Sequence, residues 1–396
     1  MDKRVNAIEL SNGWVYVSDS HSWRKVSNNG EVGYLCIDVD EKARNRVFNR
    51  FVNAQREYIE KSVIPLGFIL VTNQCNKMCD FCYANANTDE EKRYVDVRDI
   101  EKLVCLVGNK DRTNSVAFSG GEPLLYWEEV IEPVISKVLG GGGKIYTNGE
   151  LLDEDKAKKL VEWGTRVYVA FDLGYSGAGH GDDVLEKLGY LSRRVDGFGS
   201  LIDLSVCIAE RDFDKTIDFD LPLDVCGAVD FNVVSGSGKE FSEEIVKNEI
   251  LRIKNGKDFR HSFLYRYLKW IIAVIQYGFK LTSCDVTMNL NYRGDVMLCH
   301  EYGSFYDLND RYEEMKVDSI KNLESVIDLD TKIKDKAMKS RLGFPKDECF
   351  DCVLKYWCGG ICWANVGVNN YLCDIARKAF PFVLDFVVSE RILSRI

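Results

Sequence analysis

The chain has 396 residues, of which 46% are hydrophobic and 29% are charged. This balance is typical of a globular protein with a buried core, and it excludes a mainly disordered chain. The formal net charge of −10 gives no electrostatic support for a long nucleic-acid groove, so we expect no nucleic-acid partner.

The first 64 residues contain short runs in which apolar and polar residues alternate. This pattern predicts strands over residues 7–10, 14–17 and 32–37. A charged helix is expected from residue 40 to 62, and Pro65 ends this segment. The chain therefore begins with a small β-rich segment followed by one helix.

From residue 66 onward the pattern changes to strands alternating with helices, such as those expected over 153–163 and 182–194. Six buried strands are predicted, over residues 67–72, 115–120, 143–148, 167–173, 201–208 and 228–234. Alternation of this kind indicates a parallel α/β sheet. Six units favour a partial (β/α)6 TIM-like barrel over a closed eightfold one, although spacing alone leaves an open doubly wound sheet as an alternative.

Residues 242–279 carry apolar side chains at helical spacing, which predicts one or two core-facing helices. The longest apolar run, Trp270 to Phe279, is too short for a helix that spans a bilayer, which needs roughly 20 apolar residues. The N-terminus also lacks the apolar core of a signal peptide. We therefore expect a cytoplasmic protein with no membrane partner.

Cysteine is unusually abundant, with 14 residues against 4 histidines. In a reducing compartment, clustered thiols indicate zinc or iron–sulfur sites rather than disulfides. Ten of the cysteines lie in two groups, within residues 75–82 and 284–373. The other four stand apart in apolar stretches and are predicted to be small buried side chains. They are Cys36, Cys105, Cys207 and Cys226.

The first group, Cys75, Cys79 and Cys82, has the spacing C-x3-C-x2-C and directly follows the first barrel strand. Active-site loops of barrel enzymes lie at this carboxyl end of the strands. Three thiolates can bind three irons of a cubane cluster and leave the fourth iron open, as in a catalytic site. The alternatives are a zinc site or a cluster with a distant fourth cysteine.

The next strand ends in Ser119-Gly120-Gly121-Glu122-Pro123. Two adjacent glycines let a ligand approach the backbone closely, and Glu122 supplies an acceptor suited to an amino group. A simple turn after a strand is the alternative. The position beside the cysteine loop favours a binding role.

Together these two motifs resemble the radical S-adenosylmethionine (SAM) superfamily, whose signature is C-x3-C-x-aromatic-C, with Phe81 in the aromatic position. The resemblance implies a [4Fe–4S] cluster held by Cys75, Cys79 and Cys82, with SAM chelating the open iron. It also implies reductive cleavage of SAM to a 5′-deoxyadenosyl radical that abstracts hydrogen from a substrate.

The resemblance further implies which residues contact SAM. Residues 120–122 match the stretch that meets the SAM amino group, and Tyr83 matches the position whose backbone meets the adenine. Asn148 ends the third strand, where it would face the cofactor. Asp172 fits a looser form of the family's Ser-x-Asp-Gly pattern, because Ala170 stands in the serine position.

The second group of cysteines resembles the SPASM domain found in many radical SAM enzymes that modify peptides. It comprises Cys284, Cys299, Cys349, Cys352, Cys358, Cys362 and Cys373, with Gly294 between the first two. The resemblance implies two auxiliary [4Fe–4S] clusters, which makes three clusters in total. Its pattern assigns Cys284, Cys299 and Cys362 to one auxiliary cluster, which then has an open iron or a more distant ligand. It assigns Cys349, Cys352, Cys358 and Cys373 to the other. A pair of zinc sites is the alternative.

Four parts follow from these patterns. They are an N-terminal β-hairpin and helix segment over 1–64, a radical SAM partial barrel over 65–240, linking helices over 241–283 and a SPASM domain over 284–396. The first part would be a capping element or a short leader-peptide-binding module that grips a peptide along a strand edge.

The function implied by the resemblance is that of a maturase. It would abstract hydrogen from a residue of a ribosomally made peptide, give a crosslink, thioether or oxidised residue, and draw electrons from a flavodoxin or ferredoxin. One alternative is oxidation of a cysteine or serine in a protein, as in anaerobic sulfatase maturation, with Asp172 or Asp285 as a candidate base. Others are dehydrogenation of a small molecule and a non-catalytic multi-cluster electron carrier. No catalytic residue is identified beyond these candidates.

Overall fold

The computed structural model of the chain divides into two compact units, which we describe separately. The sheet unit comprises residues 62–237 and 286–337, and the helical unit comprises 1–61, 238–285 and 338–396. The structure describes residues 7–9, 11, 14–17, 21–25, 41–79, 82, 84, 86–87, 91–108, 116–172, 182–209, 226, 228–234, 243–256, 259, 262–280, 286–300, 311–342, 349, 351–358 and 371–390. The four domain boundaries predicted above stay predictions.

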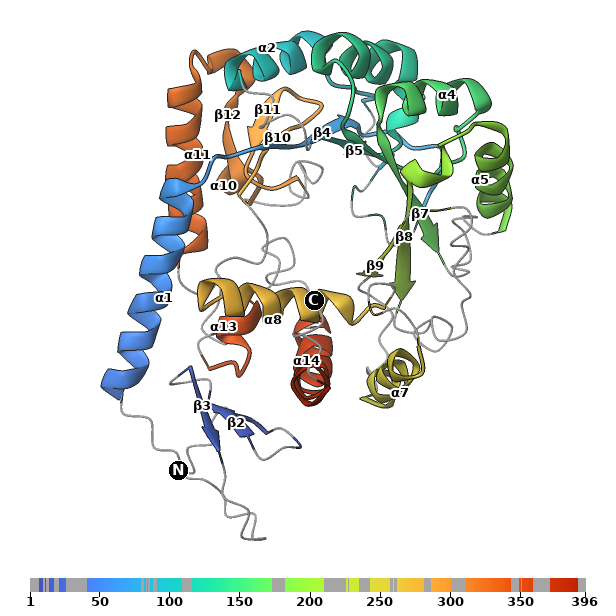
Figure 1. Cartoon of the computed structure of the whole chain (residues 1–396). Helices are drawn as coiled ribbons and strands as arrows, with labels where there is room; N and C mark the ends of the chain where they lie inside the picture. Colours follow the sequence, from blue (N-terminus) through green and yellow to red (C-terminus); the bar gives the residue numbers. More distant parts are fainter. Residues whose placement is uncertain are drawn as a thin grey trace. The chain divides into compact units, whose positions relative to one another are not determined.

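The sheet unit contains six parallel strands that pair in chain order (Figure 1). They are β4 (Leu66–Thr72), β5 (Ala117–Gly120), β6 (Lys144–Thr147), β7 (Arg166–Asp172), β8 (Ile202–Ala209) and β9 (Ala228–Val234). The six strands predicted from sequence are thereby confirmed. Because the strands are parallel, their carboxyl ends meet at one edge of the sheet.

Helices connect these strands and lie along one side of the curved sheet (Figure 1). They include α2 (Val97–Val107), α4 (Glu154–Trp163) and α5 (Asp182–Arg194), and a 3-10 turn, η4 (Gly199–Leu201), precedes β8. The carboxylates of Asp96 and Asp153 cap the first two helices by accepting a backbone N–H each. After β5 the chain forms a 3-10 turn, η1 (Pro123–Tyr126), and two π-helical segments, η2 (Trp127–Ile131) and η3 (Val134–Leu139).

Three short strands extend the sheet beyond β4, and the sequence did not predict them. β10 (Met288–Leu290) pairs with β4 in parallel, and β11 (Asp295–Met297) and β12 (Lys316–Ser319) continue antiparallel. Gly294 lies in the turn between β10 and β11 with φ of 80°, where a side chain is disfavoured. The short helices η7 (Ile320–Asn322) and α10 (Arg311–Met315) and the longer α11 (Val326–Arg341) accompany these strands.

The helical unit begins with an antiparallel sheet of β1 (Ala7–Glu9), β2 (Trp14–Val17) and β3 (Ser22–Lys25), followed by α1 (Glu41–Lys61). Its other helices are α7 (Glu243–Lys254), α8 (Tyr265–Tyr277), α13 (Lys355–Cys358) and α14 (Tyr371–Ser389). The first two predicted strands and the charged helix are confirmed, β3 was not predicted, and residues 32–37 lie outside the described residues.

His21 and Tyr16 fix the small sheet within the helical unit. The His21 ring nitrogens lie 2.5 Å from the Tyr16 hydroxyl and 2.6 Å from the Gly278 carbonyl oxygen. The His21 ring also stacks on Phe279 with centroids 4.8 Å apart, and Tyr16 meets Trp357 edge-on at 5.2 Å. Burial lowers the pKa of His21, so the neutral ring is favoured in the folded chain.

The four isolated cysteines were predicted to be buried, and the structure tests this prediction for two of them. Cys226 is buried, as predicted. Cys105 is exposed, so the prediction of a buried side chain was wrong there. It lies on α2, whose buried positions are Ile100, Leu103 and Val107, and it falls on another face of that helix. Cys36 and the side chain of Cys207 lie outside the described residues. No helix in the described part of the chain is long and apolar enough to cross a membrane.

Candidate active site

Cys75, Cys79 and Cys82 lie on the loop that follows β4, at the carboxyl edge of the sheet. All three side chains are half-buried. The Cys82 backbone N–H donates to the Cys79 carbonyl at 3.1 Å, which gives the end of the loop a turn. Phe81 and Tyr83 lie outside the described residues, so the expected adenine contact stays a prediction.

Asn87 holds the first part of this cysteine loop. Its side-chain oxygen accepts from the Cys75 N–H at 2.9 Å, and its amide nitrogen donates to the carbonyls of Cys75 and Lys77 at 2.9 and 3.1 Å. Asn87 has φ of 66°, a left-handed conformation that asparagine tolerates better than most residues. The cysteine loop is therefore shaped by the protein's own hydrogen bonds.

Gly120 and Gly121 let the end of β5 lie directly against the cysteine loop. A Cβ on Gly121 would stand 2.0 Å from the Gln74 carbonyl oxygen, and one on Gly120 would stand 2.6 Å from that of Thr72. The Gly121 N–H donates to the Thr72 carbonyl at 2.8 Å, and the Glu122 N–H to the Gln74 carbonyl at 2.7 Å. The end of β5 thus packs so closely on residues 72–74 that neither position has room for a side chain, which explains both glycines.

The Glu122 carboxylate joins the β5 and β6 ends. It is only 1% exposed, and its oxygens accept from the Leu124 N–H at 2.9 Å, the Thr147 hydroxyl at 2.8 Å and the Asn148 N–H at 2.9 Å. Burial raises the pKa of Glu122 to about 7, and these three donors act in the opposite direction. Its expected contact with the SAM amino group stays a prediction, and both oxygens already have protein donors.

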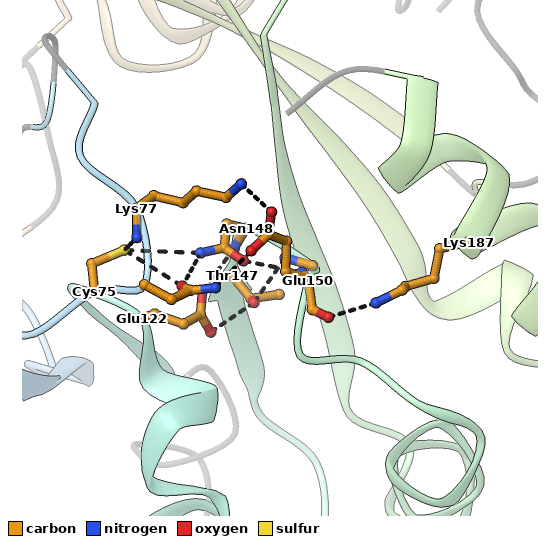
Figure 2. Close-up of polar contacts among 9 residues, drawn as sticks. Cys75, Lys77, Glu122, Thr147, Asn148, Glu150 and Lys187 are labelled. Carbon is orange, nitrogen blue, oxygen red and sulfur yellow. Dashed lines mark hydrogen bonds and ion pairs between the residues drawn. The ribbon is translucent and has the colours of Figure 1, made fainter. Parts of the chain in front are cut away.

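Asn148 lies in the turn after β6 and points toward Cys75 (Figure 2). Its amide nitrogen is 3.8 Å from Cys75 Sγ and 2.7 Å from Asn76 Oδ1, and its oxygen accepts from the Glu150 N–H at 3.0 Å. The Lys77 N–H approaches the same sulfur at 3.4 Å. Burial raises the pKa of the Cys75 thiol, whereas these two N–H groups lower it.

Glu150 ties the cysteine loop to the same turn. Its carboxylate accepts from Asn76 Nδ2 at 2.8 Å and forms an ion pair with Lys77, while its carbonyl accepts from Lys187 Nζ at 2.5 Å (Figure 2). We did not identify Asn76, Lys77 or Glu150 from the sequence. The available signal was their position, since two lie inside the C-x3-C spacing and the third closely follows a strand.

Asp172 is the last residue of β7, so its backbone lies at the same carboxyl edge. Its side chain lies outside the described residues, as does Asp285. Their expected roles therefore stay predictions.

Four of the C-terminal cysteines lie in the helical unit. The Cys352 N–H donates to the Cys349 carbonyl at 3.2 Å, and Cys358 ends α13. Cys373 lies one turn before Arg377 on α14. Burial lowers the pKa of Arg377, but a hydrogen bond with Cys352 and the nearby Cys373 and Cys349 raise it overall. Three of the four predicted ligands of one auxiliary cluster are thus near enough to Arg377 to act on its charge.

Of the three cysteines predicted to hold the other auxiliary cluster, the structure describes only one. Cys299 follows β11 in the sheet unit and is half-buried, whereas Cys284 and Cys362 lie outside the described residues. Within the described residues, no three Cys, His, Asp or Glu side chains are close enough to hold one metal ion. The donor chemistry of the first loop nevertheless fits an iron–sulfur cluster, because it offers three thiols, and backbone and amide N–H groups face the sulfur of Cys75.

Residues 69–204 match the profile of the Radical SAM superfamily. A relative described as an uncharacterised protein of Archaeoglobus fulgidus is 23% identical over 330 residues, which are 76% of this chain and 75% of the relative. The matched residues 69–204 include the cysteine loop and the ends of β5 and β6.

Solved structures share the fold at low sequence identity. Native anSMEcpe with bound AdoMet and Cp18Cys peptide is 18% identical with a TM-score of 0.59, covering 83% of this chain and 99% of that one. Streptococcus suis SuiB bound to precursor peptide SuiA is 17% identical with a TM-score of 0.50, covering 87% and 81%. The partial barrel is the fold that these matches show.

Proposed function

Since the chain carries a radical SAM domain over residues 69–204, we propose that it is an enzyme that modifies a peptide or protein substrate and uses three [4Fe–4S] clusters. The observation that carries this proposal is the arrangement at the carboxyl edge of the sheet. There the loop of Cys75, Cys79 and Cys82 is hydrogen-bonded to the end of β5 and to the turn after β6.

Cys75, Cys79 and Cys82 would hold the cluster that binds SAM. When bound, this cluster supplies the electron that cleaves SAM. The chain's own residues shape the site: Asn87 fixes the backbone of the cysteine loop, and Gly121 lets β5 approach it. The buried carboxylate of Glu122 keeps the ends of β5 and β6 together.

The helical unit would hold an auxiliary cluster on Cys349, Cys352, Cys358 and Cys373. The approach of three of these cysteines to Arg377 supports this assignment. Cys284, Cys299 and Cys362 would hold the second auxiliary cluster. A flavodoxin or ferredoxin would supply electrons to the enzyme.

A peptide substrate is supported by the two structural neighbours, whose solved structures contain a bound peptide. The product would be a crosslink, a thioether or an oxidised residue. The contacts of Tyr16 with Trp357 and of His21 with Gly278 hold β1–β3 within the helical unit, which supports a structural role for this small sheet.

The proposal is tested by counting iron and sulfide in anaerobically reconstituted protein and then adding dithionite and SAM. About twelve irons per chain and release of 5′-deoxyadenosine are expected. Two zinc ions and no SAM cleavage would contradict it. Several clusters without SAM cleavage would instead indicate an electron carrier.

The second candidate is oxidation of a cysteine or serine in a protein, and the likeness to anSMEcpe favours it. The two candidates differ in product. Mass spectrometry of cysteine- and serine-containing peptides after turnover distinguishes an oxidised side chain from a crosslink or thioether.

A further inference from the structure

We propose that the turn after β6, residues 148–150, is a positioning element that sets the reduction potential of the cluster on the cysteine loop. Asn148 would act through a hydrogen bond to the sulfur of Cys75, and Glu150 would act by balancing the charge of Lys77. This inference rests on the proposed function, because it requires a cluster held by Cys75.

The first argument is the geometry of Asn148. Its side chain is fixed at both ends, since Oδ1 accepts from the Glu150 N–H at 3.0 Å and Nδ2 donates to Asn76 Oδ1 at 2.7 Å. The side chain is 7% exposed, so water does not compete freely for it. In this orientation Nδ2 lies 3.8 Å from Cys75 Sγ.

The second argument is the count of donors at one sulfur. The Lys77 N–H lies 3.4 Å from Cys75 Sγ, and Asn148 Nδ2 adds a second donor from a different strand end. Hydrogen bonds to ligand sulfurs stabilise the more negative, reduced state of an iron–sulfur cluster. Removal of the Asn148 donor should therefore lower the reduction potential.

The third argument is the charge beside the loop. Lys77 lies two residues from Cys75, and its ammonium group forms an ion pair with Glu150. Glu150 also accepts from Asn76, so its carboxylate holds two residues of the C-x3-C spacing. Loss of the carboxylate charge leaves the positive charge of Lys77 uncompensated, which favours the reduced cluster. Substitution of Glu150 should therefore raise the potential.

The test measures midpoint potentials in the anaerobic full-length protein by EPR-monitored titration. The relevant signal is the one that Cys75→Ala abolishes. Asn148→Ala should lower the midpoint potential of this signal. At a fixed solution potential, the ratio of reduced to oxidised cluster should change three- to tenfold, because one hydrogen bond contributes roughly 0.5–1.5 kcal/mol. A tenfold change corresponds to about 59 mV for a one-electron couple. The isosteric Glu150→Gln should shift the same signal in the opposite direction.

Glu132→Gln is the matched control, because it removes the same carboxylate charge from an ion pair with Lys159 elsewhere in the sheet unit. Its potential should equal that of the wild type. Asn148→Asp keeps the size of the side chain and its acceptor for the Glu150 N–H, so it serves if Asn148→Ala does not fold, and it should lower the potential further. Wild-type potentials in the Asn148 and Glu150 variants, with the cluster retained, would overturn the inference. Absence of the Cys75-dependent signal from the wild type would instead contradict the proposed function.

Discussion

The two cysteine-rich regions of the chain are stabilised in different ways. The loop of Cys75 continues a strand of the parallel sheet, and hydrogen bonds from the ends of β5 and β6 fix it. In the second region, Cys358 ends the four-residue helix α13 and Cys373 lies on α14, and the rings of Trp357 and Phe380 pack with their centroids 5.2 Å apart. The comparison indicates that the sheet preorganises the first site, whereas aromatic packing between helices stabilises the second.

The largest expected effect is the loss of SAM cleavage when the cysteine loop alone is changed. Changing Cys75, Cys79 and Cys82 together to alanine should abolish SAM cleavage and leave about eight irons per chain, because the auxiliary clusters have their own ligands. Iron analysis and detection of 5′-deoxyadenosine check this. Retained cleavage would show that the cysteine loop is not the site.

Cys352→Ala tests the second region alone. It should remove up to about four irons and lower the melting temperature, because the auxiliary cluster proposed for this region would lose a ligand, while SAM cleavage persists. Iron content and thermal unfolding are the measurements. Cys105→Ala is a control, since that exposed cysteine lies outside both groups. An unchanged iron content in Cys352→Ala would argue against Cys352 as a ligand.

Gly121→Ala tests whether the sheet preorganises the cysteine loop. The added Cβ would meet the Gln74 carbonyl oxygen at 2.0 Å, so the loop must move. A loss of about 3 kcal/mol in unfolding free energy and weaker SAM binding are expected. Gly142→Ala is the control. It has φ of 82° but open space around the new Cβ, so its cost should be only about 1 kcal/mol. Equal costs for the two variants would contradict a close packing of β5 on the loop.

The smallest effect concerns His21, whose contacts include Tyr356 on α13. Burial lowers its pKa from the ordinary value of 6.5, so the folded state binds this proton less tightly than the unfolded state. The stability contributed by His21 is therefore fully present above about pH 6.5 and declines as the pH falls. The backbone of His21 is left-handed, with φ of 44°, and asparagine tolerates this conformation, so His21→Asn is a suitable variant. It should cost about 1–2 kcal/mol at pH 7.5 and less at pH 5.5, as read from thermal unfolding. A cost that does not change with pH would rule out the titration of His21 as its source.

The fold was predictable where periodicity extends over several residues. The six parallel strands and helices such as α4 and α5 were predicted from the alternation of strands and helices along the chain. The strands β10, β11 and β12 have only three or four residues each and occur among glycines and polar residues. Segments this short carry too few positions for a period to be recognised.

The site was predictable as a set of motifs but not as a network. The C-x3-C-x2-C spacing and the two glycines identified the cysteine loop and its neighbour on β5. The bonds from Glu122 to Thr147 and Asn148 depend on the relative positions of β5 and β6, and local sequence does not encode these. Asn76 and Glu150 were missed for the same reason, since their partners are 72 and 74 residues away.

The helical unit joins the two ends of the described chain, and this has a consequence for biosynthesis. The Ser11 N–H donates to Asp385 Oδ1 at 2.8 Å across 374 residues of sequence. At translation rates of about 5–20 residues per second, β1 to β3 would wait roughly 20 to 75 s for α14 to be synthesised. During this interval the ring of Tyr16 lacks its partner Trp357. The N-terminal sheet therefore reaches its full set of contacts only after nearly the whole chain has been synthesised.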